Sequence, residues 1–194
     1  MKTQLTPDRE QTARFLHLLD PKGIFTFQAF DDDKARKNMG LARVLHGSLE
    51  QHWADLTNLN LRGAGIFVMI NKGDGITHPG DKTCRTAKNV LAVRSLFSDL
   101  DGAPVEPVLE ALPPDIVIES SPGRYHTYWL TNDCPLDEFT LRQSQIALKF
   151  NSDKSVCDLP RVMRLPGFWH QKTTPFMTHI ISPTKPSWLP ISIS

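Results

Sequence analysis

SLFSDLDG, at residues 95–102, joins a short apolar run to two carboxylates. The residues from Ser95 to Phe97 are typical of a buried strand, and side chains two apart in a strand project to the same side. Asp99 and Asp101 are therefore expected to face one small volume. Such carboxylates repel each other, and Mg²⁺ or Mn²⁺ between their oxygens relieves the repulsion, as in phosphoryl-transfer sites. The alternative is a solvated turn that follows a strand.

The chain after this acidic pair predicts a β-hairpin. Residues 115–120 and 126–130 have the pattern of strands, and the turn SSPGR joins them. Gly123 permits a close approach of the backbone, while Arg124 and His126, two apart, can project together towards a phosphate. The alternative for His126 is a structural histidine, hydrogen-bonded among neighbouring aromatic residues.

A third polar stretch, residues 153–167, places Asp153 and Asp158 ahead of Arg161 and Arg164. A further carboxylate followed by two arginines three apart could complete a metal site and neutralise a triphosphate. The order of residues does not decide which aspartate faces the first acidic pair. The alternative is a set of surface ion pairs, which contribute little energy.

The remaining patterns favour an α+β fold with a mixed or antiparallel sheet. Helices are expected from Thr6-Pro7-Asp8, with the threonine hydroxyl as cap, and over residues 41–56, 83–96 and 136–150; further strands are expected over 24–30, 63–71 and 176–181.

Composition limits the class of protein. The 194 residues carry 22 Lys and Arg against 21 Asp and Glu, a net charge of +1. The overall charge therefore does not indicate a nucleic-acid-binding protein, although it is compatible with a local basic groove. Three cysteines without metal spacing favour a reducing compartment. The chain also lacks a long apolar run and a secretory leader, so we predict a cytoplasmic protein without membrane association.

In this order, the three polar stretches resemble the archaeo-eukaryotic primase superfamily, and within it the RepB-like primase domains of plasmid, phage and other mobile-element replication proteins. The likeness spans about residues 60–175. It rests first on the acidic pair in SDLDG and on SSPGRYHTYW, in which His126 is the last residue of the family's second motif. It rests also on Asp153 and Val156 with the two arginines that follow, on RLPG followed by Lys172, and on GAGIFVMINKGDG ahead of the acidic pair. One position departs: many members carry a small hydroxyl residue where this chain has Arg124.

The resemblance implies an RRM-like catalytic sheet with flanking helices and a smaller N-terminal α/β unit. The expected division is 1–60 for that unit, 61–182 for the catalytic core and 183–194 for a tail. A replicative helicase or an initiator is the expected protein partner. The chain would then be a stand-alone primase, a split subunit or an excised domain.

The implied activity is that of a DNA primase or primase-polymerase, which transfers nucleotides on a single-stranded DNA template with two Mg²⁺ or Mn²⁺ ions. Asp99, Asp101 and Asp153 would hold the ions, with Asp158 as competitor, and His126 joins the catalytic set. Nucleoside triphosphate would contact Ser121, Arg124, His126, Arg161, Arg164 and Lys172, and template would contact Arg85, Lys88 and Arg94, unless these are the solvated face of a helix. Two rivals are an inactive DNA-binding replication initiator and a metal-dependent nuclease.

Overall fold

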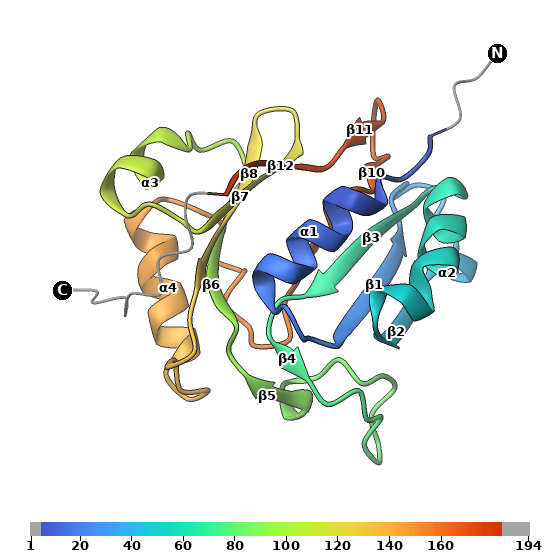
Figure 1. Ribbon diagram of the computed structural model, residues 1–194, viewed down its shortest axis with the longest axis horizontal. Coiled ribbons are helices and arrows are strands. Elements are labelled where there is room, and N and C mark those ends of the chain that lie inside the picture. Colours follow the sequence, from blue (N-terminus) through green and yellow to red (C-terminus); the bar gives the residue numbers. More distant parts are fainter. Residues whose placement is uncertain (1–4, 184–194) are drawn as a thin grey trace.

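A computed structural model describes residues 5–183, and it contains two four-stranded sheets with helices between and around them (Figure 1). All the strand pairs in these residues are antiparallel. The expected α+β class is therefore confirmed, with an antiparallel arrangement. The predicted tail lies outside the described residues apart from Pro183.

One sheet holds the acidic stretch and the hairpin. Its order is β12-β7-β8-β6, with β6 (Ser95–Leu100), β7 (Ile116–Ser121), β8 (Arg124–Leu130) and β12 (His179–Pro183). Leu96 and Phe97 are buried, as the apolar run predicts. The predicted hairpin is confirmed, because Ser121 pairs with Arg124 across the turn.

The other sheet has the order β2-β1-β3-β9, with β1 (Phe25–Asp31), β2 (Arg43–Gly47), β3 (Ala64–Met69) and β9 (Val162–Arg164). Most residues of its central strands β1 and β3 are buried, and Phe27 and Ile66 belong to the core. Strands from both sides of residue 60 thus pair in one sheet. The domain boundary expected there stays a prediction.

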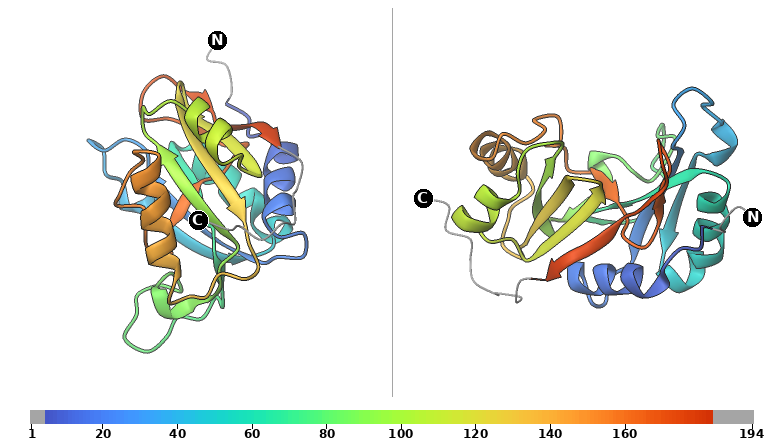
Figure 2. Two further views of the ribbon diagram at one scale, coloured as in Figure 1. Left: turned by 90° about the vertical axis from the view of Figure 1, so that its left-hand side faces the viewer. Right: turned by 90° about the horizontal axis from the view of Figure 1, so that it is seen from above.

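The α-helices of the described residues lie between and beside the two sheets (Figure 1). They are α1 (Arg9–Leu19), α2 (Leu49–Leu61), α3 (Glu106–Ala111) and α4 (Phe139–Lys149). Helix α1 lies between the two sheets, and α3 and α4 lie on the far side of the β12-β7-β8-β6 sheet (Figures 1 and 2). The Phe15 ring of α1 meets Tyr128 of β8 at 5.4 Å between centroids. None of the helices described has the length and apolarity that a bilayer span requires.

Shorter elements complete the described chain. These are η1 (Met39–Leu41), β4 (Lys72–Gly73), η2 (Ala87–Asn89), β5 (Val90–Ala92), β10 (Trp169–His170) and β11 (Phe176–Met177). The strand expected over 176–181 is divided between β11 and β12.

Three helix predictions need correction. Helix α1 is capped by Asp8, whose Oδ1 accepts hydrogen bonds from the Glu10 and Gln11 amides, and not by the Thr6 hydroxyl. The helix expected over 41–56 is wrong in its first half, because residues 43–47 form β2 and pair with β1. The helix expected over 83–96 is also wrong: this segment contains a short 3₁₀ turn and β5 before β6 begins.

Candidate active site

The two sheets meet around a cavity of about 170 Å³. Its lining comes from both sheets and from the segment after β9: Phe67, Asp99, Asp101, Ser120, Ser121, Arg124, His126, Val162, Met163, Arg164, His170 and Lys172. Seven residues that the sequence singled out therefore line one space. The other predicted ones, Asp153, Asp158, Arg161, Arg85, Lys88 and Arg94, do not line it.

Asp99 and His126 occupy directly opposed positions of β6 and β8. The imidazole Nε2 lies 3.7 Å from Asp99 Oδ1, which is longer than a hydrogen bond. Burial, with a smaller contribution from Arg164, lowers the pKa of His126 to about 3, so the ring is neutral near pH 7. Tyr128 Oη lies 3.3 Å from Nδ1, a contact in which either group could be the donor, and burial raises the pKa of Tyr128, so the phenol is protonated.

Of the two later aspartates, Asp153 and Asp158, it is Asp153 whose backbone is hydrogen-bonded to that of Asp99. Its N–H donates to the Asp99 carbonyl at 3.1 Å. Burial and then the charge of Asp153 raise the pKa of Asp99, against opposing effects of nearby cations. The Asp153 carboxylate accepts from the Ser155 amide at 2.8 Å, whereas Asp158 forms an ion pair with Arg161.

Asp101 lies outside the strand. Strand β6 ends at Leu100 and Gly102 turns the chain with φ +95°, so the alternation of strand side chains does not reach Asp101. Its side chain is 57% exposed and pairs with Arg124, whereas that of Asp99 is 30% exposed. Asp99 and Asp101 line the same cavity, as expected, but Asp101 does so from beyond the strand and with its carboxylate paired to Arg124.

Arg164 is committed to a partner that sequence reasoning missed. Asp32, at the end of β1, accepts from both terminal nitrogens of Arg164, at 2.6 and 3.2 Å. The guanidinium carbon lies 4.7 Å from the Phe67 ring centroid. The charge of Arg164 is thus already compensated. The acidic triplet at residues 31–33 was the available signal, but it indicates only a strand end.

Lys172 and His170 belong to one short segment beside this ion pair. Asp32 Oδ2 also accepts from the Gln171 amide at 2.8 Å, which fixes the backbone between them. Burial, followed by Arg164, lowers the pKa of Lys172. His170 was missed: its Nδ1 lies 3.1 Å from the Ser120 carbonyl, and burial lowers its pKa to about 4.

The three residues expected to contact DNA do not share a helical face. Arg94 is buried, pairs with Asp20 at 2.8 Å and stacks on the Phe25 ring at 4.5 Å, so it is not accessible to a strand. Arg85 donates to the Gln28 side chain and to a backbone carbonyl. Lys88 is exposed.

Asp99, Asp101 and Asp153 are the candidate ligands of a divalent cation. Within residues 5–183, no three His, Cys, Asp or Glu side chains are arranged to hold a metal ion. Carboxylate oxygens are ligands that Mg²⁺ and Mn²⁺ prefer, and the Asp153 backbone is hydrogen-bonded to that of Asp99, so these two residues are the ones that could share an ion. Asp101 could join them only after leaving Arg124.

Comparison with known proteins bears on the fold. Residues 106–179 match the sequence model of the RepB DNA-primase N-terminal domain. This segment includes His126, Asp153 and Lys172 but begins after Asp99 and Asp101. No curated protein sequence is significantly similar to the chain.

Three solved structures are similar in fold. The archaeo-eukaryotic primase domain of the cyanophage S-2L primase-polymerase has 21% identity over 92% of each chain, with a TM-score of 0.72. Primase RepB′ has 17% identity and a TM-score of 0.64 over 89% of this chain and 55% of its own. The catalytic domain of primase RepB′ in complex with initiator DNA has 15% identity and a TM-score of 0.59 over 89% and 85%.

Together with the antiparallel sheets and their shared cavity, these matches define the fold as that of the archaeo-eukaryotic primases. Within that fold, residues 106–179 are similar in sequence to the RepB primase domain, and 89% of the chain is similar in fold to primase RepB′.

Proposed function

We propose that the protein is a DNA primase or primase-polymerase that acts in the replication of a mobile element. One observation carries the proposal: Asp99 and His126 on paired strands share a single cavity with Arg124 and Lys172, within a fold of the primase type. A solved structure of that type is described as a complex with initiator DNA. That description supports DNA as a partner of this chain, and a single-stranded template is part of the proposal.

The reaction would join nucleotides in a growing strand. A 3′-hydroxyl loses its proton to solvent, and its oxygen forms a bond to the α-phosphorus of a nucleoside triphosphate. The bond from that phosphorus to the oxygen that bridges it to the β-phosphorus breaks, and pyrophosphate leaves. Lys172 and Arg124 supply positive charge for the phosphates, and neutral His126 supplies a hydrogen-bond donor instead of a charge. Ser121, at the hairpin turn, adds a hydroxyl to the same cavity.

Asp99, Asp153 and Asp101 would hold two Mg²⁺ or Mn²⁺ ions, with Asp158 as the competing ligand. When bound, such ions lower the pKa of the attacking hydroxyl and compensate charge on the leaving pyrophosphate. Arg124 is both the partner of Asp101 and a phosphate ligand in this proposal. A triphosphate that draws Arg124 to its oxygens therefore releases Asp101.

A DNA-binding initiator without catalytic activity is the second candidate. The observation that favours it is the ion pair between Asp101 and Arg124, together with the lack of a three-ligand metal group in the described residues. Such a protein would keep the fold for origin recognition. It would bind DNA and make no product.

Primer synthesis on single-stranded DNA with labelled nucleotides and Mg²⁺ or Mn²⁺ tests the proposal. We expect product from the wild type and none from the double variant Asp99→Ala, Asp101→Ala. Asp137→Ala, an exposed aspartate ahead of α4, serves as matched control and should retain activity. DNA binding without product would support the initiator. Degradation of labelled DNA without added nucleotides would instead indicate a nuclease.

A further inference from the structure

The β2-β1-β3-β9 sheet carries a pair of aromatic residues, exposed Phe30 and partly buried Phe67, whose ring also contacts the Arg164 guanidinium. In the β1 to β3 register Gln28 is opposite Phe67 and Phe30 is opposite Gly65, so Phe30 and Phe67 lie on the same face. The Phe30 ring is 39% exposed and meets Phe67 edge-to-face at 5.6 Å between centroids. Phe67 also lines the cavity that contains Asp99. The aromatic pair is therefore continuous with the candidate active site.

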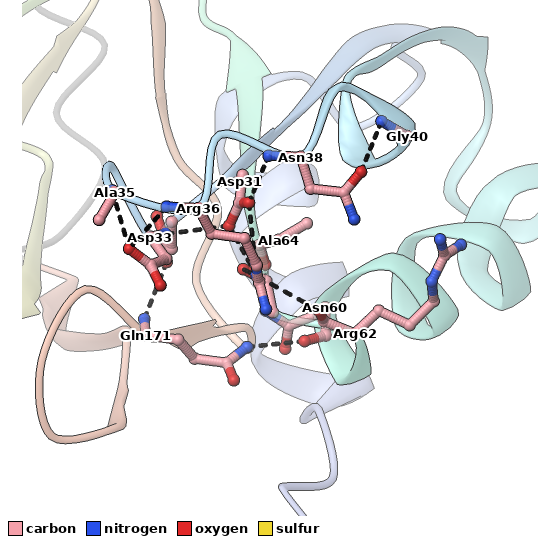
Figure 3. A network of polar contacts seen from close by, with 12 residues as sticks. Asp31, Asp33, Ala35, Arg36, Asn38, Gly40, Asn60, Arg62, Ala64 and Gln171 are labelled. Atoms are coloured by element: carbon pink, nitrogen blue, oxygen red, sulfur yellow. Dashed lines mark hydrogen bonds and ion pairs between the residues drawn. The ribbon is translucent and has the colours of Figure 1, made fainter.

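The loop that follows Phe30 is built by its own polar contacts (Figure 3). Arg36 forms an ion pair with Asp31 at 2.6 Å, and Asp31 also accepts from the Asn38 amide at 2.7 Å. Asp33 accepts from the Ala35 amide at 2.9 Å. The acidic side chains of this loop are thus occupied within the loop or, for Asp32, with Arg164.

This loop presents two exposed lysines, Lys34 and Lys37, and neither forms an ion pair with any residue in the described range 5–183. Lys34 is close enough to Lys172 to contribute to lowering the pKa of Lys172. The positive charge of Lys34 therefore lies near that of Lys172, which lines the cavity, while the neighbouring Asp33 carboxylate accepts from the Ala35 and Arg36 amides.

We propose that Phe30, Phe67 and Lys34 form the surface on which the unpaired template strand enters the site. Aromatic rings stack on any base whose face is free, and cations beside them bind the phosphates, which is the combination that single-stranded nucleic acid requires. A duplex hides its base faces and gains little from exposed phenyl rings. The inference rests on the proposed function for the meaning of the strand as a template.

Fluorescence anisotropy with a labelled oligothymidine, without nucleotides or divalent ions, tests this surface. We expect Phe30→Ala to weaken binding on the order of tenfold through lost stacking. Lys34→Ala should weaken binding several-fold and reduce the salt slope by about 0.7, the value for one phosphate contact on a single strand. Phe30→Leu, which keeps apolar area without a ring, should bind nearly as poorly as the alanine variant.

Two exposed controls lie elsewhere, both on α4: Lys149→Ala, and Leu141→Ala, where the leucine is 63% exposed. Both should bind like the wild type. Wild-type affinity in Phe30→Ala and Lys34→Ala, or a larger loss in Lys149→Ala than in Lys34→Ala, would overturn the inference. Full binding by Phe30→Leu would also overturn it, because that result indicates an apolar partner instead of stacked bases.

Primer synthesis separates this inference from the proposed function. If the wild type makes no primer while Phe30→Ala and Lys34→Ala lose DNA affinity, the strand-binding surface stands and the polymerising role fails. If primers form while these variants bind normally, the activity stands and this surface is wrong.

Discussion

Asp32 and Arg164 form an ion pair whose side chains are 2% and 8% exposed. Removing one partner from such a pair leaves a buried charge without compensation, which typically costs about 3–5 kcal/mol. Gly65 lies against both side chains, and a Cβ there would clash with them. The pair therefore depends on a glycine of β3 as well as on its own two residues.

We predict that Asp32→Ala lowers the free energy of unfolding by about 3–5 kcal/mol. The double variant Asp32→Ala, Arg164→Ala should lose clearly less than the sum of the two single variants, because it has no orphaned charge. Urea unfolding of the four proteins measures the coupling. Strictly additive losses would show that the two side chains do not stabilise each other.

His126 predicts a pH dependence of stability. Its pKa is about 3 in the folded protein against an ordinary value of 6.5, so between these values the unfolded chain binds a proton that the folded one does not. Stability should therefore fall as pH decreases from about 6.5, by up to about 1.4 kcal/mol per pH unit from this residue. Unfolding measured from pH 7 to 5 should show a shallower slope in His126→Gln.

The control for that slope is His17→Gln, an exposed histidine in the last turn of α1. It should follow the wild-type pH profile. An unchanged slope in His126→Gln would mean that the imidazole takes up a proton in the folded state.

Among the elements, the start of α2 decides between a helix that begins at Leu41 and one that begins at Leu49. Apolar residues three and four apart predict a helix from Leu41, but Ser48 caps a helix that begins at Leu49, in a capping box with Gln51. The hydroxyl accepts from the Gln51 amide at 3.3 Å. The signal of a serine followed three residues later by glutamine was present, and the apolar spacing obscured it.

We predict that Ser48→Ala destabilises the protein by about 1 kcal/mol, because an N-cap is lost. In the interior of a helix over residues 41–56, the same change would instead stabilise slightly, since alanine is the better helix former. Ser144→Ala, in the middle of α4, gives that mid-helix comparison. Thermal or urea unfolding reports the sign. A stabilised Ser48→Ala would contradict the observed helix start.

The elements that the sequence predicts correctly are those with local causes. Strands β1, β3 and β6 are short apolar runs, and the β7 to β8 hairpin has its own turn signal. Residues 83–96 fail because distant partners decide their conformation: Arg85 donates to Gln28 and Pro160, and Arg94 pairs with Asp20. Side chains that look like a solvated helical face thereby become internal contacts.

In the candidate site too, the sequence predicts what local patterns determine and misses what distant contacts determine. The spacing of Asp99 and His126 places them on paired strands, and their sharing of a cavity with Lys172 agrees with the order of the motifs. Asp32 and His170 could not be found in this way. Their contacts, to Arg164 and to the Ser120 carbonyl, join parts of the chain that no local pattern relates.

Strand β9 supplies the outer position of a sheet whose other strands all come from residues 25–69. During translation, the ribosome must therefore synthesise almost the whole described chain before this sheet can be completed. A chain divided after residue 69 would give one fragment with three strands of this sheet and another that carries β9 without its partner. The two fragments could complete the sheet only by pairing β3 with β9.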